Sequence, residues 1–285
     1  MIAKFENSDS WVVLSNIEKQ IKAKIERIGT PLKEWDITIN YGIKTGYNDA
    51  FIISAERRKE LIEQDPKSVE VIRPILRGRD IKKFGFDFAD LWLINTHNGL
   101  KESGIKPINV NDYPAIKKHL DSYFPGLQKR GDKGDTPYNL RNCAYMDDFY
   151  KHKIIYPELT KFLNFYFDNK NFLVNNKCFI LSGEKIYYLI AFLNSSLFKF
   201  AFKDDFPELL GGTRELRKVF LEQVKVKYVS EEINVEFMRL VLKCQDLQGD
   251  QKKKKEYELE IDNMLFEIYD LNDDEREAIG FIVVQ

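Results

Sequence analysis

The chain has 285 residues, 44% of them hydrophobic, which is enough for a sizeable core and excludes a wholly disordered protein. Its 44 lysines and arginines nearly balance its 45 aspartates and glutamates, so the net charge is −1 and the pI is about 6.4. A protein that binds nucleic acid through a broadly basic surface is therefore excluded. Phosphate binding would need a local excess of positive charge.

The three cysteines, Cys143, Cys178 and Cys244, lie far apart, with no C-x-x-C pair or Cys/His cluster. The sequence thus predicts free thiols in a reducing compartment, with neither a disulfide framework nor a structural zinc site. Residues 1–11 (MIAKFENSDSW) lack the apolar stretch of a signal peptide. No stretch approaches the ~20 apolar residues of a membrane span. We expect a soluble, cytoplasmic protein without a membrane partner.

The first predicted element is an amphipathic helix over residues 15–28, with isoleucines at helical spacing. Ser15 and Glu18 fit a capping box, and the Gly-Thr-Pro sequence at 29–31 ends the helix. Apolar and polar residues then alternate over 37–43, which predicts a half-buried strand. A turn over 44–49 and a second strand over 50–53 would complete a hairpin.

The middle of the chain mixes short strands and helices without regular β-α-β alternation, which predicts an α+β fold with a mixed sheet. The most apolar helix is predicted over residues 184–202. The other predicted elements are helices at 55–64 and 112–123, strands at 90–95, 153–156, 164–167 and 172–181, and a long irregular segment at 124–148.

The C-terminal part changes character at about residue 229. Two helices are predicted over 231–247 and 252–269, joined near Gly249, and a short helix follows with Asn272 as its cap. A C-terminal helical hairpin of this kind more often packs or docks than catalyses.

The residues that catalysis needs are not brought together by the sequence pattern. Asp147, Asp148, Glu158 and Lys161 come nearest to a nuclease cluster, but their spacing does not place them on one strand face. The histidines have no ligand-like spacing, and there is no phosphate-binding loop, nucleophile elbow or Asn/Asp-Pro-Pro-aromatic motif of an adenine methyltransferase. We expect no catalytic residue and no metal ligand. The glycine pair before Thr213 fits a flexible connection better than a phosphate site.

Positive charge is concentrated in two glycine-containing segments. Residues 73–83 (RPILRGRDIKK) hold five cations and one anion, and residues 129–141 (KRGDKGDTPYNLR) hold four cations and two anions. Loops on a rigid scaffold are where binding residues gather, and arginine can hold guanine or phosphate with two hydrogen bonds. These segments favour nucleic-acid binding.

The same segments resemble a known family. In order along the chain they are 42–52 (GIKTGYNDAFI), 73–81 (RPILRGRDI), 113–120 (YPAIKKHL), 129–134 (KRGDKG) leading into 138–141 (YNLR), and 153–158 (KIIYPE). Together they resemble the TaqI-like C-terminal specificity domain of type IIG restriction enzymes. Those enzymes fuse an endonuclease, an adenine methyltransferase and a target-recognition domain in one chain.

The resemblance implies sequence-specific recognition of double-stranded DNA for a restriction–modification system. The methyltransferase and endonuclease domains, in the same or a partner chain, are the implied partners. S-adenosylmethionine and magnesium are implied in those catalytic domains, and no cofactor in this chain. The chain would be a specificity subunit or, as we favour, a piece of a longer protein.

The expected organisation is a lead-in helix and connector over 1–35, a target-recognition domain over 36–228 and a helical region over 229–285. We expect the basic residues near the turns to contact phosphates and those of the second loop to reach a groove. The alternative for Arg79 and Asp80 is an internal ion pair or a brace for the loop. The expected DNA-binding residues are Lys44, Thr45, Asn48, Arg77, Arg79, Lys82, Lys83, His97, Lys129, Arg130, Lys133, Tyr138 and Arg141.

Two other functions remain open at this point. The basic loops could bind an acidic protein partner, which would make the chain a protein-interaction module. The chain could also be an enzyme with a metal site that the pattern does not reveal. Binding to duplex DNA that weakens steeply with salt would separate DNA recognition from the interaction module.

Overall fold

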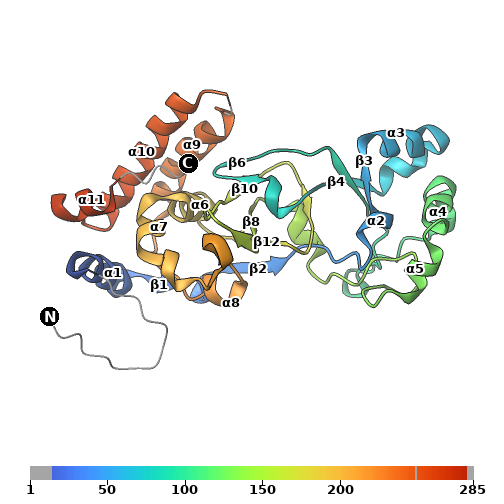
Figure 1. The fold of residues 1–285 in the computed structure, drawn as a ribbon, viewed down its shortest axis with the longest axis horizontal. Helices are drawn as coiled ribbons and strands as arrows, with labels where there is room; N and C mark the ends of the chain where they lie inside the picture. The colour runs from blue at the N-terminus through green and yellow to red at the C-terminus, as the bar shows by residue number, and fades with distance from the viewer. Residues whose placement is uncertain (1–14, 248, 281–285) are drawn as a thin grey trace.

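The computed structural model describes residues 15–247 and 249–280. Residues 1–11, for which no signal peptide is expected, lie outside them. The molecule is elongated, with two lobes that flank a central sheet (Figure 1). We call the part with α1 and α6–α11 the helical lobe and the part with α2–α5 the outer lobe. Each lobe has its own cluster of buried hydrophobic residues. The two clusters meet across the central sheet.

The central sheet has four strands in the order β10-β8-β12-β2, all antiparallel. Its inner strands alternate between the two cores. On β8, Ile154 and Tyr156 belong to the helical-lobe cluster, whereas Ile155 belongs to the outer-lobe cluster. The strands are β2 (Ile37–Tyr41), β8 (Lys153–Pro157), β10 (Tyr166–Asp168) and β12 (Cys178–Gly183).

In the helical lobe, α6 packs against α9, and α9 packs against α10. None of the helices within 15–247 and 249–280 is both long and apolar enough to cross a membrane. The helices are α1 (Asn16–Ile28), α6 (Ile186–Asn194), α7 (Ser196–Phe202), α8 (Lys218–Leu221), α9 (Glu231–Asp246), α10 (Gln251–Ile268) and α11 (Asp273–Ile279). The short strands β1 (Thr30–Pro31) and β15 (Lys225–Val226) pair antiparallel beside α1.

The prediction of one helix over 184–202 is wrong, because the chain breaks at Ser195. Its backbone is extended there, and its hydroxyl accepts a hydrogen bond from the Phe198 amide to cap α7. Asp262 of α10 accepts hydrogen bonds from the amide and hydroxyl of Ser196. Buried polar caps therefore satisfy a helix start inside an apolar segment.

The outer lobe contains a second sheet of order β11-β4-β7-β3, in which β11 and β4 are parallel and the other pairs antiparallel. Its strands are β3 (Ile52–Ser54), β4 (Ile72–Leu76), β7 (Leu91–Ile94) and β11 (Leu173–Val174). Its helices are α2 (Asn48–Phe51), α3 (Ala55–Gln64), α4 (Pro114–Asp121) and α5 (Phe124–Lys129). Between the lobes run the short strands β5 (Ile81–Lys82), β6 (Gly85–Phe86), β9 (Leu159–Thr160), β13 (Glu208–Leu209) and β14 (Thr213–Glu215).

The predicted hairpin over 37–53 is also wrong. Strand β2 pairs with β12 of the central sheet, and β3 pairs with β7 of the second sheet. Between them Thr45 donates a hydrogen bond to Asn48 (2.6 Å), and the chain enters the short helix α2 instead of a tight turn. The two strands therefore belong to different sheets.

Other predictions are confirmed, including the α+β class with a mixed sheet, an N-terminal helix and C-terminal helices. Helix α1 begins with the predicted capping box at Ser15 and Glu18, and α11 begins at the predicted Asn272 cap. The divisions at residues 36 and 229 stay predictions. Helices α9 and α10 nevertheless bury residues in the same cluster as α6.

A buried ion pair lies at one edge of the central sheet. The Lys153 ammonium donates to Asp168 (2.6 Å) and to the Phe149 carbonyl (2.6 Å), and both charged side chains are fully buried. Asp168 also accepts from the amides of Lys170 and Phe172. The pair thus ties β8 to β10 and to the start of β11.

We predict that Asp168→Ala lowers the free energy of unfolding by about 3–5 kcal/mol, because it leaves a buried ammonium without its counter-charge. Urea denaturation followed by circular dichroism measures this. Glu63→Ala, which removes the exposed partner of Lys59, is the control and should leave stability nearly unchanged. Equal, small effects of the two substitutions would contradict a stabilising role for the buried pair.

Candidate nucleic-acid interface

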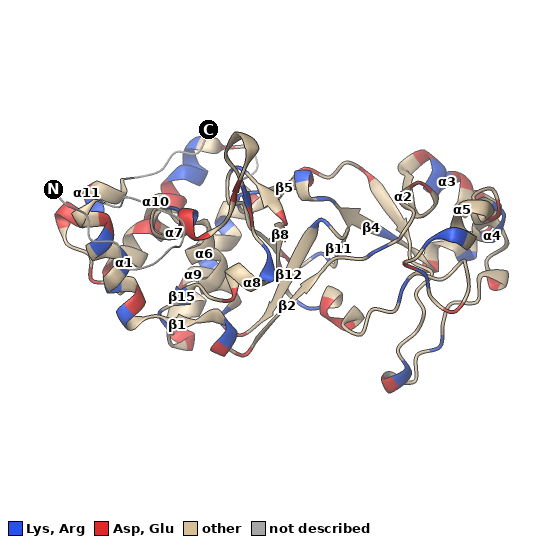
Figure 2. Cartoon of the chain, turned by 60° about the horizontal axis from the view of Figure 1, so that its bottom comes forward, with Lys and Arg blue, Asp and Glu red and all other residues tan. Residues whose placement is uncertain are grey.

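A cleft of about 570 Å³ lies where the segment after β4 meets the ends of β8 and β12. Four cations and one carboxylate line it: Arg77, Arg79, Lys82, Lys177 and Glu158. Basic and acidic residues are otherwise interspersed in both lobes (Figure 2). The cleft is therefore a local excess of positive charge in a chain of nearly neutral net charge.

Arg77 serves mainly to hold the wall of this cleft. Asp80 is buried and accepts hydrogen bonds from the Arg77 amide (2.8 Å), Nε (3.0 Å) and Nη2 (2.8 Å). These bonds close the turn η3 (Gly78–Asp80) and raise the pKa of Arg77. Asp80 therefore pairs with Arg77, and the alternative ion pair with Arg79 does not form.

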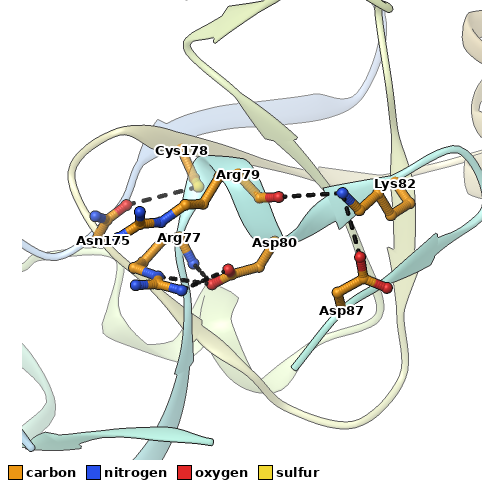
Figure 3. A network of polar contacts seen from close by, with 7 residues as sticks. All are labelled: Arg77, Arg79, Asp80, Lys82, Asp87, Asn175 and Cys178. Carbon is orange, nitrogen blue, oxygen red and sulfur yellow. Dashed lines mark hydrogen bonds and ion pairs between the residues drawn. The ribbon is translucent and has the colours of Figure 1, made fainter. Parts of the chain in front are cut away.

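Arg79 is thereby left available in the cleft. It is exposed, and it has no ion pair among the residues that the structure describes. Figure 3 shows its side chain extending toward Asn175 and away from Asp80. Its neighbour Lys82 pairs with Asp87 (3.2 Å), and that pair is largely exposed. A phosphate could displace such an exposed carboxylate at little cost.

The opposite wall of the cleft was not predicted from the sequence. Lys177 pairs with Glu158 (3.0 Å), while Asn175 closes its own turn by accepting from the Lys177 amide (3.2 Å). Asn164 and Thr160 also line this wall. The polar sequence Asn-Asn-Lys at 175–177, between two apolar stretches, could have indicated this turn. The predicted strand over 172–181 included it instead.

The second basic segment lies in the outer lobe, in what we call the loop cluster (residues 42–49, 96–99 and 126–141). Arg130 is at its centre and is buried. Its guanidinium donates to the carbonyls of Thr45, Asp132, Pro137 and Asn139. Burial lowers its pKa to about 10, so it stays charged at neutral pH. Arg130 holds the loops together and is not exposed to a ligand.

Other predicted residues in the loop cluster are also engaged within it. Thr45 is buried and bonded to Asn48. The Tyr138 hydroxyl donates to Asp121 (2.6 Å). His97 Nδ1 accepts from the Gly99 amide (3.1 Å), and burial lowers the pKa of His97, so it is neutral at pH 7 and adds no charge toward a phosphate.

The exposed cations of the loop cluster surround this framework. The Lys133 ammonium donates to the Gln128 carbonyl (2.8 Å), and Arg141 pairs with Asp132 (2.9 Å) with about half of its side chain exposed. Lys129 is exposed at the end of α5. These three, with Asn48, are predicted residues of the loop cluster that a ligand can reach.

Two predicted residues remain, Lys44 in the loop cluster and Lys83 outside it. The Lys44 ammonium is 4.9 Å from the ring centroid of Tyr41, which is itself partly exposed. Lys83 pairs with Glu258 of α10 (2.8 Å), and Lys254 donates to the Lys83 carbonyl (2.9 Å). Lys83 therefore links the turn after β5 to the C-terminal helices and does not line the cleft.

The acidic residues considered as a nuclease cluster are separated. Asp148 accepts from Asn40 (2.9 Å) and Lys151 (2.8 Å), while Glu158 lies in the cleft beside Lys177. Within 15–247 and 249–280, no three His, Cys, Asp or Glu side chains are grouped as metal ligands would be.

The family model of the TaqI-like C-terminal specificity domain matches residues 73–226. The fold is similar to that of the type IIG restriction endonuclease BpuSI, with a TM-score of 0.52 and 17% identity over 89% of this chain. It is also similar to the type IIL restriction-modification enzyme MmeI, solved in complex with DNA, with a TM-score of 0.58 and 13% identity over 88% of this chain. The chain spans about a third of either protein, 33% and 35%.

We predict that Arg130→Met lowers the free energy of unfolding by about 2–3 kcal/mol, since buried carbonyls lose their donors. Lys133→Met, a neighbouring exposed cation, is the matched control and should change stability little. Thermal and urea unfolding check both. Unchanged stability of Arg130→Met, or duplex binding lost at a temperature where the variant is folded, would give Arg130 a contact role instead.

Proposed function

Since more than half of its length matches that family model, the chain belongs to the TaqI-like C-terminal specificity domains, and we propose that it recognises a sequence in double-stranded DNA for a restriction–modification enzyme. The observation that carries the proposal is the basic cleft, whose Arg79 is exposed and has no ion pair among the described residues.

In this proposal the cleft faces the duplex. Arg79 and the exposed lysines Lys82 and Lys177 contact phosphates, because their charges are accessible and their pairing is weak. Asn164, which also lines the cleft, is an amide of the kind that pairs with adenine. Lys129, Lys133 and Arg141 extend the contact along the backbone from the loop cluster.

The catalytic steps belong to other parts of the enzyme. We propose a type IIG arrangement, in which methyltransferase and endonuclease domains carry S-adenosylmethionine and magnesium and this chain supplies the specificity. The TaqI-like match supports the specificity role, and the similarity to BpuSI over a third of that chain is consistent with a larger assembly. Because the cleft is basic only locally, binding by this chain alone should be weak.

We predict that Arg79→Ala weakens binding to a mixed-sequence duplex and lowers the slope of log K against log salt by about 0.9, the value for one phosphate contact. Fluorescence anisotropy of a labelled duplex from low to moderate salt measures both. Lys59→Ala on α3 is the matched control: it removes an exposed cation outside the cleft and should leave the slope unchanged.

Two results would overturn the proposal. One is that the unmodified chain binds no duplex even at low salt, which would favour the interaction-module alternative. The other is binding that does not weaken as salt rises. A change in the preferred base pair on Arg79→Ala, with the salt slope unchanged, would assign Arg79 to base reading and keep the proposal.

A further inference from the structure

A β-hairpin projects beside the cleft with a leucine at its tip. Strands β13 and β14 pair antiparallel and are joined by the turn η8 (Leu210–Gly212). Leu210 is completely exposed (100%), and Gly211 and Gly212 both have left-handed backbone angles (φ 75° and 76°). Left-handed angles at both positions favour glycine, so the turn places its one large side chain at the outermost point.

The base of this hairpin is rigid. Arg214 pairs with Asp204 (3.0 Å) and Glu208 (2.7 Å), and it also donates to the Phe206 carbonyl (3.2 Å). The next residue but one, Leu216, is fully buried in the helical-lobe core. The expectation that the glycine pair marks a flexible connection stays a prediction.

The outward face of the hairpin carries exposed leucines. Strand β14 also pairs with β9, and the register places Arg214 opposite Thr160, both largely buried. Because strand side chains alternate, Leu209 and Leu159 lie on the other face, where they are 43% and 45% exposed. On this face Thr213 lies opposite Leu209 and Glu215 lies opposite Leu159. We call Leu159, Leu209 and Leu210 the leucine edge.

The surroundings of the leucine edge indicate what covers it. Leu159 and Thr160 line the basic cleft, so the edge is continuous with the proposed DNA site. The Lys161 ammonium lies 3.9 Å from the position that a Cβ on Gly211 would take, and Lys161 is exposed. A DNA duplex offers a partner to both side chains. The apolar side chain can contact the stacked bases, and the cation beside it can contact the anionic phosphates.

We infer that Leu210 is an apolar wedge that enters the base stack of the bound duplex while Lys161 and the cleft hold the backbone. Leucine is among the side chains that proteins insert between base steps to kink DNA. Unstacking opposes insertion, so the wedge acts only where the cleft already holds the phosphates. The inference rests on the proposed DNA binding and assigns one residue a role in deforming the duplex.

The test compares two short labelled duplexes of the same mixed sequence, one intact and one with a single abasic site. An abasic site removes part of the unstacking cost, so a wedge should favour that duplex. We expect the unmodified chain to bind it about three- to tenfold more tightly than the intact duplex. A 2-aminopurine beside the site should brighten on binding, because its fluorescence is quenched by stacking.

Leu210→Ala should abolish the preference and the 2-aminopurine signal, whereas Leu210→Phe should keep both. Val235→Ala on α9 is the matched control, because it truncates a 44% exposed aliphatic side chain away from the cleft. Since Leu210 makes no buried contact, Leu210→Ala should melt at the same temperature as the unmodified chain. This separates a wedge from a structural role.

The outcomes are distinct. If Leu210→Ala keeps the preference and the signal, the leucine contacts something other than DNA, such as another protein domain, and the wedge is overturned while DNA binding stands. If the unmodified chain binds neither duplex at low salt, the proposed function fails and the wedge with it. Lost preference with Arg79-dependent binding retained supports the wedge.

Discussion

The central sheet, whose inner strands β8 and β12 lie between the two cores, is the constraint on which the rest of the structure depends. Along these two strands the apolar residues contribute alternately to the helical lobe and to the outer lobe. All five residues of β8 are accordingly buried. The one charge on that strand, Lys153, is tolerated because Asp168 on the adjacent strand and the Phe149 carbonyl satisfy it. Two cores that share one sheet leave a boundary at the strand ends, where neither core covers the chain.

The candidate site lies at that boundary. The turn η3 after β4, the turn between β11 and β12 and the end of β8 meet there, and each is fixed by short-range polar contacts. Asp80 holds the first turn through Arg77, and Asn175 holds the second. Since those residues fix the two turns, the backbone that carries Arg79 and Lys177 is already ordered before a ligand binds. Preorganisation of this kind lowers the entropic cost of binding.

Sequence patterns predicted the features that depend on residues close together in the sequence, such as helix caps and helix boundaries. The capping box of α1 and the boundaries of α3 need only local information, and both are as expected. The hairpin over 37–53 failed because its strands pair with segments distant in the chain, which periodicity cannot report. The same limit applies to the site: Arg79 and Arg130 look alike in the sequence, since both precede or follow glycine in a basic segment. Only tertiary contacts make one exposed and the other the buried centre of four carbonyls.

The near-zero net charge is compatible with DNA recognition for the same reason. An exposed pair such as Lys82–Asp87 cancels in the total but contributes little to stability, so a phosphate can replace the carboxylate. The buried pairs, Arg77–Asp80 and Lys153–Asp168, cannot exchange in this way, because separating them would leave an uncompensated charge. The net charge of the whole chain is therefore more negative than the charge that a duplex would contact at the cleft. The cations that matter for DNA binding are those that can leave a carboxylate partner on contact with a phosphate. Those cations are exposed, whereas the cations that stabilise the fold are buried.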